Sequence, residues 1–423
     1  MKPLSTNPKV LLCTKCRKSP RGFVDMLGYN IRKIIVSPSL PRDSSIGLRF
    51  IKKNVPQVEI LEFPQWQQYV NKLKEGWDIV GFSFYQDEID DIARMAEEAR
   101  RHNVGELWAG NYGALDENVP GMVDRVFIGP AEDHFARLFG GRVSDDQIEH
   151  PAITFQFNLK PVKTSLLKLG FLYTKRGCPF KCIFCQTPAF EKRLFNINIE
   201  SIKEVLITYK RLGISHLVVT DELFGADHQF TEQITELFAR YKFFWFAQSR
   251  ASLFSRHLDT WYSRGLRAPS IGAEAMDQSA LNNVDKLQSV EEIVEYARRT
   301  KEKPGMYRMV NYMIGYENMT AEETLEDIMR IKELGCEAHG INILTPFPKT
   351  PLWDRIESRY GIFDRTYSKY DTKHLVWNHP HISPTQMHKL HIKAIRSLNN
   401  PLKTYGRFIT CFLIGEQARK RFP

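Results

Sequence analysis

The sequence lacks any apolar run of 18 or more residues, and its start, Met1 to Ser5, has no apolar core of the kind that a secretory signal carries. It also lacks an even set of cysteines suited to a disulfide framework, since it has seven. Together these absences predict a protein of the reducing cytoplasm without a membrane-spanning helix. Histidine is missing from the start of the chain, and the first one is His102.

The formal charge of +10 is concentrated at the end of the chain. From Lys389 to Arg421 there are eight basic residues and one acid, Glu416, which gives +7. Such a tail is typical of proteins that bind nucleic acid or an anionic membrane surface, and it is also compatible with a simply solvated segment. The apolar run Phe408–Ile414 inside it fits a membrane interface, the wall of a lipid-sized pocket or a last core helix. Of the outside partners we expect peripheral membrane contact rather than nucleic acid.

A chain of 423 residues is long enough for two or three domains. In its first third, short apolar runs alternate with helical patterns, which predicts an α/β fold with a doubly wound parallel sheet. We assign residues 1–140 to this Rossmann-like domain. Residues 141–170 are predicted as a linker, because glycine, acidic residues and Pro151 interrupt the pattern there. The predicted strands are Val10–Cys13, Val58–Leu61, Asp78–Ser83, Glu106–Gly110 and Asp124–Gly129.

A second strand–helix rhythm fills residues 171–355, with capping boxes at Ser289–Glu292 and Thr320–Glu323 opening two of its helices. Residues 356–423 are predicted as a mostly helical, basic extension. A helix there carries His388 and His391 at a spacing that could hold a metal, although a surface or core placement is the simpler interpretation. The predicted strands are Phe171–Tyr173, His216–Thr220, Phe243–Ala247, Ser270–Glu274, Met309–Gly315 and Gly340–Thr345.

Three cysteines, Cys178, Cys182 and Cys185, follow the first of these strands at the spacing C-x3-C-x2-C. One short loop with this spacing can place three thiolates around one face of an iron–sulfur cube and leave one iron without a protein ligand. A structural zinc site would need a fourth ligand, and the other close pair, Cys13 and Cys16, lies far upstream. The pattern therefore indicates a cluster, with zinc or unrelated buried thiols as the alternatives.

The cysteine loop, with an aromatic residue, Phe184, before its last cysteine, resembles the signature of the radical S-adenosylmethionine (SAM) superfamily. This resemblance implies a 4Fe–4S cluster whose open iron binds SAM and whose electron cleaves it. It also implies that the six strand–helix units form a partial (β/α)6 barrel with its chemistry at the carboxyl ends of the strands.

Polar residues stand at those strand ends. Gly272-Ala-Glu274 resembles the Gly-x-Glu strand end of the superfamily, so we expect Glu274 to contact the ribose or amino group of SAM. Asp221 and Glu222 resemble the acidic pair after the second barrel strand. Arg250, together with Gln248 and Ser249, is a candidate for binding the methionyl carboxylate. Each of these acids could alternatively be a helix cap.

The loops that follow the strands of the first domain lie where the cobalamin-binding domain of many radical SAM enzymes makes its contacts, and Gly129-Pro-Ala-Glu132 resembles the Gly-x-x-Glu turn of that domain. The chain departs from the family in lacking the Asp-x-His-x-x-Gly motif, so histidine ligation of cobalt from that position is not expected. The alternative is a domain that no longer binds cobalamin and only shapes the substrate cavity. The candidate cobalamin contacts are Ser83, Tyr85, Gly110, Asn111, Tyr112, Gly129 and Glu132.

The order of these parts resembles the cobalamin-linked radical SAM group, which includes C-methyltransferases and the anaerobic magnesium-protoporphyrin cyclase. We therefore predict a C-methyltransferase acting on an unactivated carbon of a small, hydrophobic or aromatic substrate, with flavodoxin or ferredoxin as electron donor. The alternative is a radical oxidative cyclase, rearrangement or carbon–carbon coupling enzyme. A third, more distant interpretation is a basic iron–sulfur protein that binds nucleic acid or membrane.

Overall fold

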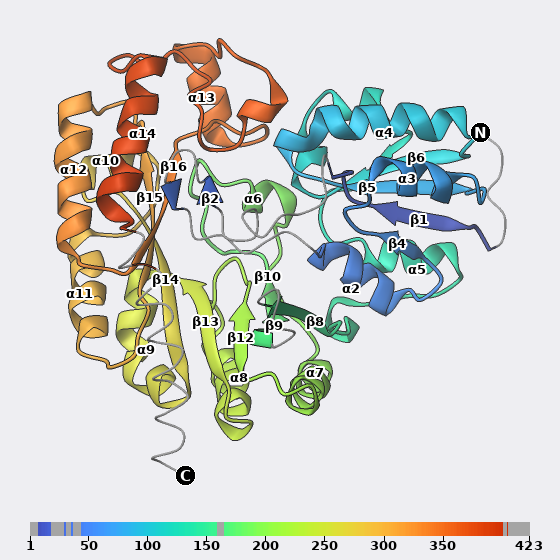
Figure 1. Ribbon diagram of the computed structural model, residues 1–423, viewed down its shortest axis with the longest axis horizontal. Coiled ribbons are helices and arrows are strands. Elements are labelled where there is room, and N and C mark those ends of the chain that lie inside the picture. Colours follow the sequence, from blue (N-terminus) through green and yellow to red (C-terminus); the bar gives the residue numbers. More distant parts are fainter. Residues whose placement is uncertain are drawn as a thin grey trace.

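The computed structural model describes residues 7–17, 29–30, 35–36, 44–158, 165–400 and 404. Two α/β units lie side by side, the N-terminal one in blue and cyan and the second in green to red (Figure 1). The basic tail, from Lys403 to Phe422, lies outside the described residues apart from Thr404, so the predictions made for it are not tested. Among the described residues no helix is both long and apolar enough to cross a membrane.

The N-terminal sheet has five parallel strands in the order β4-β1-β5-β6-β7, which confirms the doubly wound fold. Helices α3 and α4 pack on one face, and α2 and α5 pack on the other. The strand order reverses beside β1, and ligands of such sheets bind at that point outside the carboxyl ends of the strands. The elements are β1 Val10–Cys13, α2 Ile46–Asn54, β4 Glu59–Leu61, α3 Trp66–Leu73, β5 Ile79–Ser83, α4 Ile89–Arg101, β6 Glu106–Gly110, β7 Arg125–Val126 and α5 Glu132–Leu138.

The second sheet has the order β16-β15-β14-β13-β12-β9-β8, and every neighbouring pair from β9 to β16 is parallel. This is the predicted six-stranded partial barrel with one additional, antiparallel edge strand, β8. The strands are β8 Ile153–Asn158, β9 Ser165–Leu172, β12 His216–Val219, β13 Phe244–Ser249, β14 Leu266–Glu274, β15 Met309–Ile314 and β16 Ala338–Ile343. Short strand pairs are β2 Tyr29–Asn30 with β3 Ile35–Val36, and β10 Lys175–Arg176 with β11 Phe195–Asn196.

Helices cover the barrel sheet and bury one large apolar core against it. Both predicted capping boxes are present, since Ser289 and Thr320 each accept from the backbone N–H three residues later. The helices are α6 Thr187–Phe190, α7 Ile199–Arg211, α8 His228–Arg240, α9 Ala251–Ser263, α10 Gln278–Asn283, α11 Val290–Lys301, α12 Ala321–Glu333, α13 Pro351–Arg359 and α14 Pro384–Leu398. The described 3₁₀ helices are Gln86–Glu88, Tyr112–Leu115, Val119–Gly121, Asp145–Gln147 and Tyr367–Lys369.

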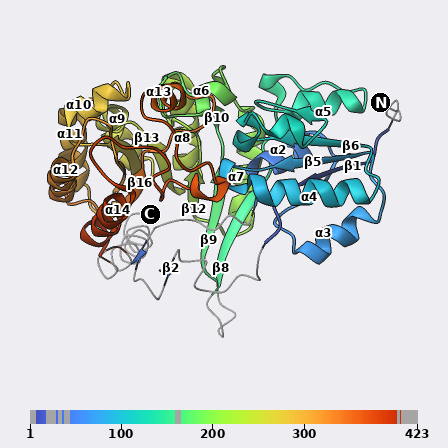
Figure 2. The same cartoon turned by 90° about the horizontal axis from the view of Figure 1, so that it is seen from above.

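The segment 141–170, predicted as a linker, contains β8 and the start of β9. Seen from above, β8 and β9 lie on the side of the barrel nearest to the N-terminal unit (Figure 2). On α14, His391 is buried and its Nε2 lies 3.0 Å from the carbonyl oxygen of Ile341, whereas His388 is exposed. His388 therefore lies on the surface and His391 in the core, which agrees with the simpler of the two interpretations.

Candidate active site

The cysteine loop begins at a glycine that no other residue could replace. Gly177 has φ +84°, and a Cβ atom on it would lie 2.0 Å from the carbonyl oxygen of Arg193. The loop then turns with a 3.0 Å hydrogen bond from the N–H of Cys185 to the carbonyl of Cys182. Burial raises the pKa of Cys178 and of Cys182, and both remain free thiols. Coordination to a metal would favour the thiolate form of such half-buried thiols.

Asp221 supports the start of this loop from the end of β12. Its carboxylate accepts from the N–H of Thr174 at 2.6 Å, the hydroxyl of Thr174 at 2.5 Å and the N–H of Lys175 at 3.3 Å. Burial raises the pKa of Asp221 to about 7. Both of its oxygens are thus engaged by the backbone and side chain before the cysteine loop, and the predicted contact of Asp221 with a cofactor stays a prediction.

Glu222, the next residue, has one free oxygen. The hydroxyl of Tyr173 donates to its Oε1, while its buried Oε2 has no hydrogen-bond partner among the described residues. Burial raises the pKa of this carboxyl group. An unpartnered buried acceptor is costly, because desolvation is not repaid by a hydrogen bond, so this oxygen is a candidate acceptor for a donor of a ligand.

Glu274 ends β14 and pairs with a residue that the sequence analysis did not identify. Its Oε1 lies 2.8 Å from Nζ of Lys286, and both side chains are mostly buried. Gly272 provides the space, since a Cβ there would lie 2.2 Å from the Glu274 oxygen and 2.8 Å from the lysine nitrogen. The positive charge of Lys286 also opposes the rise in the pKa of Cys182, so this ion pair lies beside the cysteine loop.

Arg250 lies on the same side of the loop. Its guanidinium carbon is 4.0 Å from the centre of the Phe180 ring, and Nη2 donates to the carbonyl oxygens of Lys286 and Leu287. Of the two residues predicted beside it, Ser249 donates to the carbonyl of Phe224 at 2.6 Å and Gln248 has an exposed side chain. Phe184 is half-buried against the barrel core. Of the predicted residues, Arg250 and Glu274 thus lie in a charged group near Cys182. Ser249 and Phe184 instead contact other parts of the barrel unit.

A cavity of about 540 Å³ lies between the two units. Its wall on the barrel side includes Phe171, Tyr173, Thr220 and Glu222. All seven candidate cobalamin contacts line its other wall, because the carboxyl ends of parallel strands β5, β6 and β7 meet at one edge of the sheet. These seven are Ser83, Tyr85, Gly110, Asn111, Tyr112, Gly129 and Glu132.

Aromatic side chains join the two walls. Tyr85 and Tyr112 stack with ring centres 6.1 Å apart, and Tyr112 stacks on Phe190 of α6 at 4.5 Å. The hydroxyl of Tyr112 lies 3.3 Å from that of Thr187. Asn111 holds this loop in an unusual conformation, with φ +71° and its Oδ1 accepting from the N–H of Tyr112 at 2.9 Å.

Glu132 is paired across the domain boundary. Its two carboxylate oxygens accept from Nη1 and Nη2 of Arg176 at 3.0 and 2.6 Å, and both side chains are buried. Arg176 stands two residues before Cys178 and was not identified from the sequence. The charge of Glu132 is thus balanced by an arginine of the barrel unit, and Glu132 lines the cavity as one member of this ion pair.

The chain is similar to known proteins in sequence and in structure. Residues 172–331 match the Radical SAM superfamily. An uncharacterised methyltransferase of Pyrococcus horikoshii is 26% identical over 59% of this chain and 55% of its own length. The anaerobic magnesium-protoporphyrin IX monomethyl ester cyclase of Cereibacter sphaeroides is 28% identical over 46% of this chain and 33% of its own length. The chain therefore spans about half or less of these curated relatives.

Among solved structures, the radical SAM methyltransferase TsrM from Kitasatospora setae, with cobalamin and a 4Fe–4S cluster bound, superimposes with a TM-score of 0.63 at 16% identity, over 83% of this chain and 78% of that one. At this identity the likeness shows the fold. Residues 172–331 thus match the Radical SAM superfamily, and the two-unit fold is similar to that of TsrM.

Proposed function

We propose that the chain is a cobalamin-dependent radical SAM methyltransferase that methylates an unactivated carbon of a small, hydrophobic or aromatic molecule. The observation that carries this proposal is the cavity between the two units. It is lined both by the loops of the first sheet and by Tyr173 and Glu222, which adjoin the cysteine loop. Such an arrangement lets a cofactor held by one unit face the reaction centre of the other. The methyltransferase name of a relative points to the same reaction.

The residues fit a 4Fe–4S cluster. Cys178, Cys182 and Cys185 are free thiols on one turn, and a glycine at position 177 lets the loop pass close to the backbone of Arg193. They would hold three irons as thiolates and leave the fourth open.

The residues also fit SAM beside that cluster. Lys286 and Arg250 supply cations for a carboxylate, and the buried Oε2 of Glu222 supplies an acceptor for an amino group or a ribose hydroxyl. Glu274 holds Lys286 in place through its ion pair. The role of these side chains is to orient SAM and to exclude water.

The loops that line the cavity would hold cobalamin without a histidine from the first loop. The residues after β1 are Thr14, Lys15 and Cys16, so no imidazole is available there. Gly129, with φ +93°, keeps a turn open where a Cβ would lie 3.2 Å from the carbonyl of Phe190. When bound, the cluster and SAM supply one-electron chemistry at an unactivated C–H bond, and cobalamin supplies a transferable methyl group. The chain positions these partners; an outside reductant such as flavodoxin or ferredoxin supplies the electron.

The test is anaerobic purification with hydroxocobalamin supplied, followed by counts of iron and cobalt. We expect about four irons and one cobalt per chain. With SAM labelled in its methyl group and a reductant, label should then appear on the bound cobalamin. Cys178→Ala should lose the iron and keep the cobalt. Cobalt absent from reconstituted protein that retains its iron would refute the cobalamin part of the proposal.

A radical cyclase is the second candidate, because a relative at 28% identity bears that name. Cleavage of SAM with no methyl gain in the substrate would favour it. A basic iron–sulfur binding protein would cleave no SAM at all. Peripheral membrane contact and a cytoplasmic location stay predictions, since the basic tail lies outside the described residues.

A further inference from the structure

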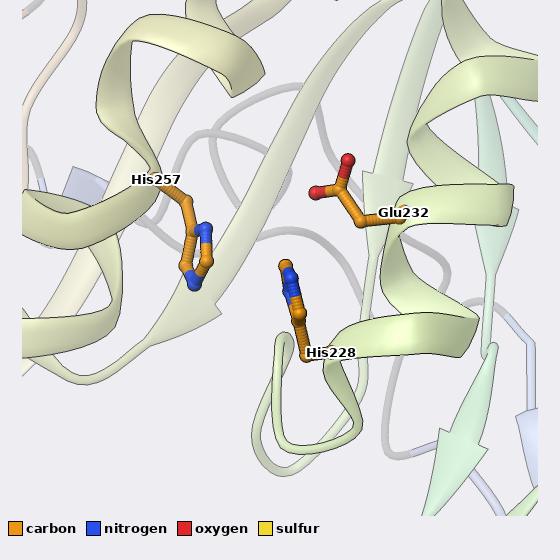
Figure 3. A group of neighbouring side chains, drawn as sticks. All are labelled: His228, Glu232 and His257. Carbon is orange, nitrogen blue, oxygen red and sulfur yellow. The ribbon is translucent and has the colours of Figure 1, made fainter.

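A second group of metal-binding side chains lies between α8 and α9, on the helical layer that covers the barrel sheet. His228 and Glu232 stand one helical turn apart on α8, and His257 faces them from α9 (Figure 3). One nitrogen of each imidazole and one carboxylate oxygen all lie within 4.8 Å of one another. Within the described residues no other group of three or more such side chains is gathered this closely.

The three side chains have ligand atoms to spare. Within the part of the chain that the structure describes, neither imidazole ring makes a hydrogen bond. Glu232 uses only its Oε2, which accepts from Nη1 of Arg264 at 2.6 Å. The same nitrogen lies 2.9 Å from the hydroxyl of Thr235, so the arginine is itself held in place. Metal-binding carboxylates are usually oriented in this way by a second residue, which bonds to one oxygen and leaves the other oxygen for the metal.

The two histidines differ in freedom. His257 packs face to face on Trp261, with ring centres 5.1 Å apart and planes inclined by 21°, which restrains its orientation. His228 is exposed at the first position of α8 and stacks on His257 at 4.8 Å. Stacked rings do not direct their in-plane nitrogen lone pairs at one point, so the exposed His228 side chain would rotate to bind an ion together with His257.

We propose that His228, Glu232 and His257 bind one divalent transition-metal ion such as Zn²⁺. Two imidazoles and a carboxylate suit zinc, with its remaining position open to water or another ligand. This site is separate from the cysteine loop and does not depend on the proposed function. A bound ion links α8 to α9. These helices follow β12, which ends near Glu222, and β13, which ends near Arg250, so the ion stabilises the helical layer behind that part of the active site.

The test uses the cluster-loaded chain, dialysed against micromolar Zn²⁺ with the zinc and iron then counted on the same sample. We expect one zinc per chain in addition to the full iron content, and a higher Tm with zinc than without. His228→Gln, Glu232→Gln and His257→Gln should each weaken zinc binding at least tenfold and abolish the shift in Tm. His228→Gln is the safest variant, because the side chain is exposed and the fold does not rest on it.

His388→Gln is the matched control, because it removes an exposed helical histidine that has no such partners. It should bind zinc as the unmodified chain does. The proposal is overturned if the intact chain takes up no zinc, if His228→Gln and Glu232→Gln bind it as well as the unmodified chain, or if zinc enters only as iron is lost. The last result would place the ion at the cysteines.

Discussion

The ion pair between Glu132 and Arg176 allows a sharp test of how the two units are joined. Arg176 donates to both oxygens of Glu132, at 3.0 and 2.6 Å, and its guanidinium lies 4.6 Å from the ring centre of Phe50. The Arg176 side chain is 9% exposed and the Glu132 side chain is 3% exposed. Both groups also line the cavity between the units, but at this low exposure a charge left without its partner is only poorly solvated.

Breaking a buried pair on one side costs about 3–5 kcal/mol, because the remaining charge stays desolvated. We expect Glu132→Leu and Arg176→Met each to lower the free energy of unfolding by about that amount. The double variant removes both charges and refills the space with apolar groups. It should therefore be more stable than either single variant, since replacing a whole buried pair is often neutral.

The assay is urea unfolding of the cobalamin-free chain, followed by circular dichroism and analysed as a double-mutant cycle. Arg137→Met is the control, because Arg137 pairs with Asp133 on the same helix in an exposed position and should show no measurable loss. Single variants as stable as the unmodified chain, or a double variant whose loss equals the sum of the two, would show that the pair does not hold the units together.

Three further changes probe the site. Gly272→Ala places a Cβ against the Glu274 oxygen and the Lys286 nitrogen, so SAM affinity measured by equilibrium dialysis should fall at least tenfold, while Gly121→Ala, with open space around it, should change nothing. Lys286→Met leaves Glu274 without its cation and should cost about 3 kcal/mol in urea unfolding, whereas Lys286→Arg should retain most of the stability. Burial raises the pKa of Asp221 to about 7, so the folded state binds a proton more tightly than the unfolded state. Tm should therefore contain a component that falls as the pH rises from about 4 to about 7 and that Asp221→Asn removes; equal slopes in both proteins would contradict this.

Much of the fold follows from hydrophobic periodicity. Each predicted strand overlaps an observed one, and parallel pairing then places the loops after β5, β6 and β7 at one edge, as expected. The edge strand β8 was missed, although Ile153, Phe155 and Phe157 alternate with polar residues. The glycines and acidic residues before it suggested a linker, and they obscured a short alternation that is typical of an antiparallel strand.

The site was predictable where a motif fixes the backbone and unpredictable where tertiary contacts select a partner. The cysteine spacing and Gly272-Ala-Glu274 belong to the first kind. Lys286 belongs to the second, since it comes from an unpatterned loop and meets Glu274 only in the folded chain. Sequence also cannot tell a carboxylate that keeps an unpartnered oxygen from one whose two oxygens are both engaged, which is the difference between Glu222 and Asp221.

Backbone strain links the two predicted binding regions. Asn111 and Glu274 both adopt positive φ, +71° and +66°, although neither is glycine. Each stands at the end of a parallel strand, one in each unit, and each strained residue costs about 1–3 kcal/mol unless its surroundings impose it. The surroundings are visible in both cases: Asn111 is fixed by the N–H of Tyr112, and Glu274 by Lys286 in the space that Gly272 leaves. A glycine would relieve the strain at either position but would remove the side chain that lies in the proposed site. Positive φ retained at these two strand ends therefore favours a requirement for both side chains, which hold Tyr112 and Lys286 in place beside the proposed site.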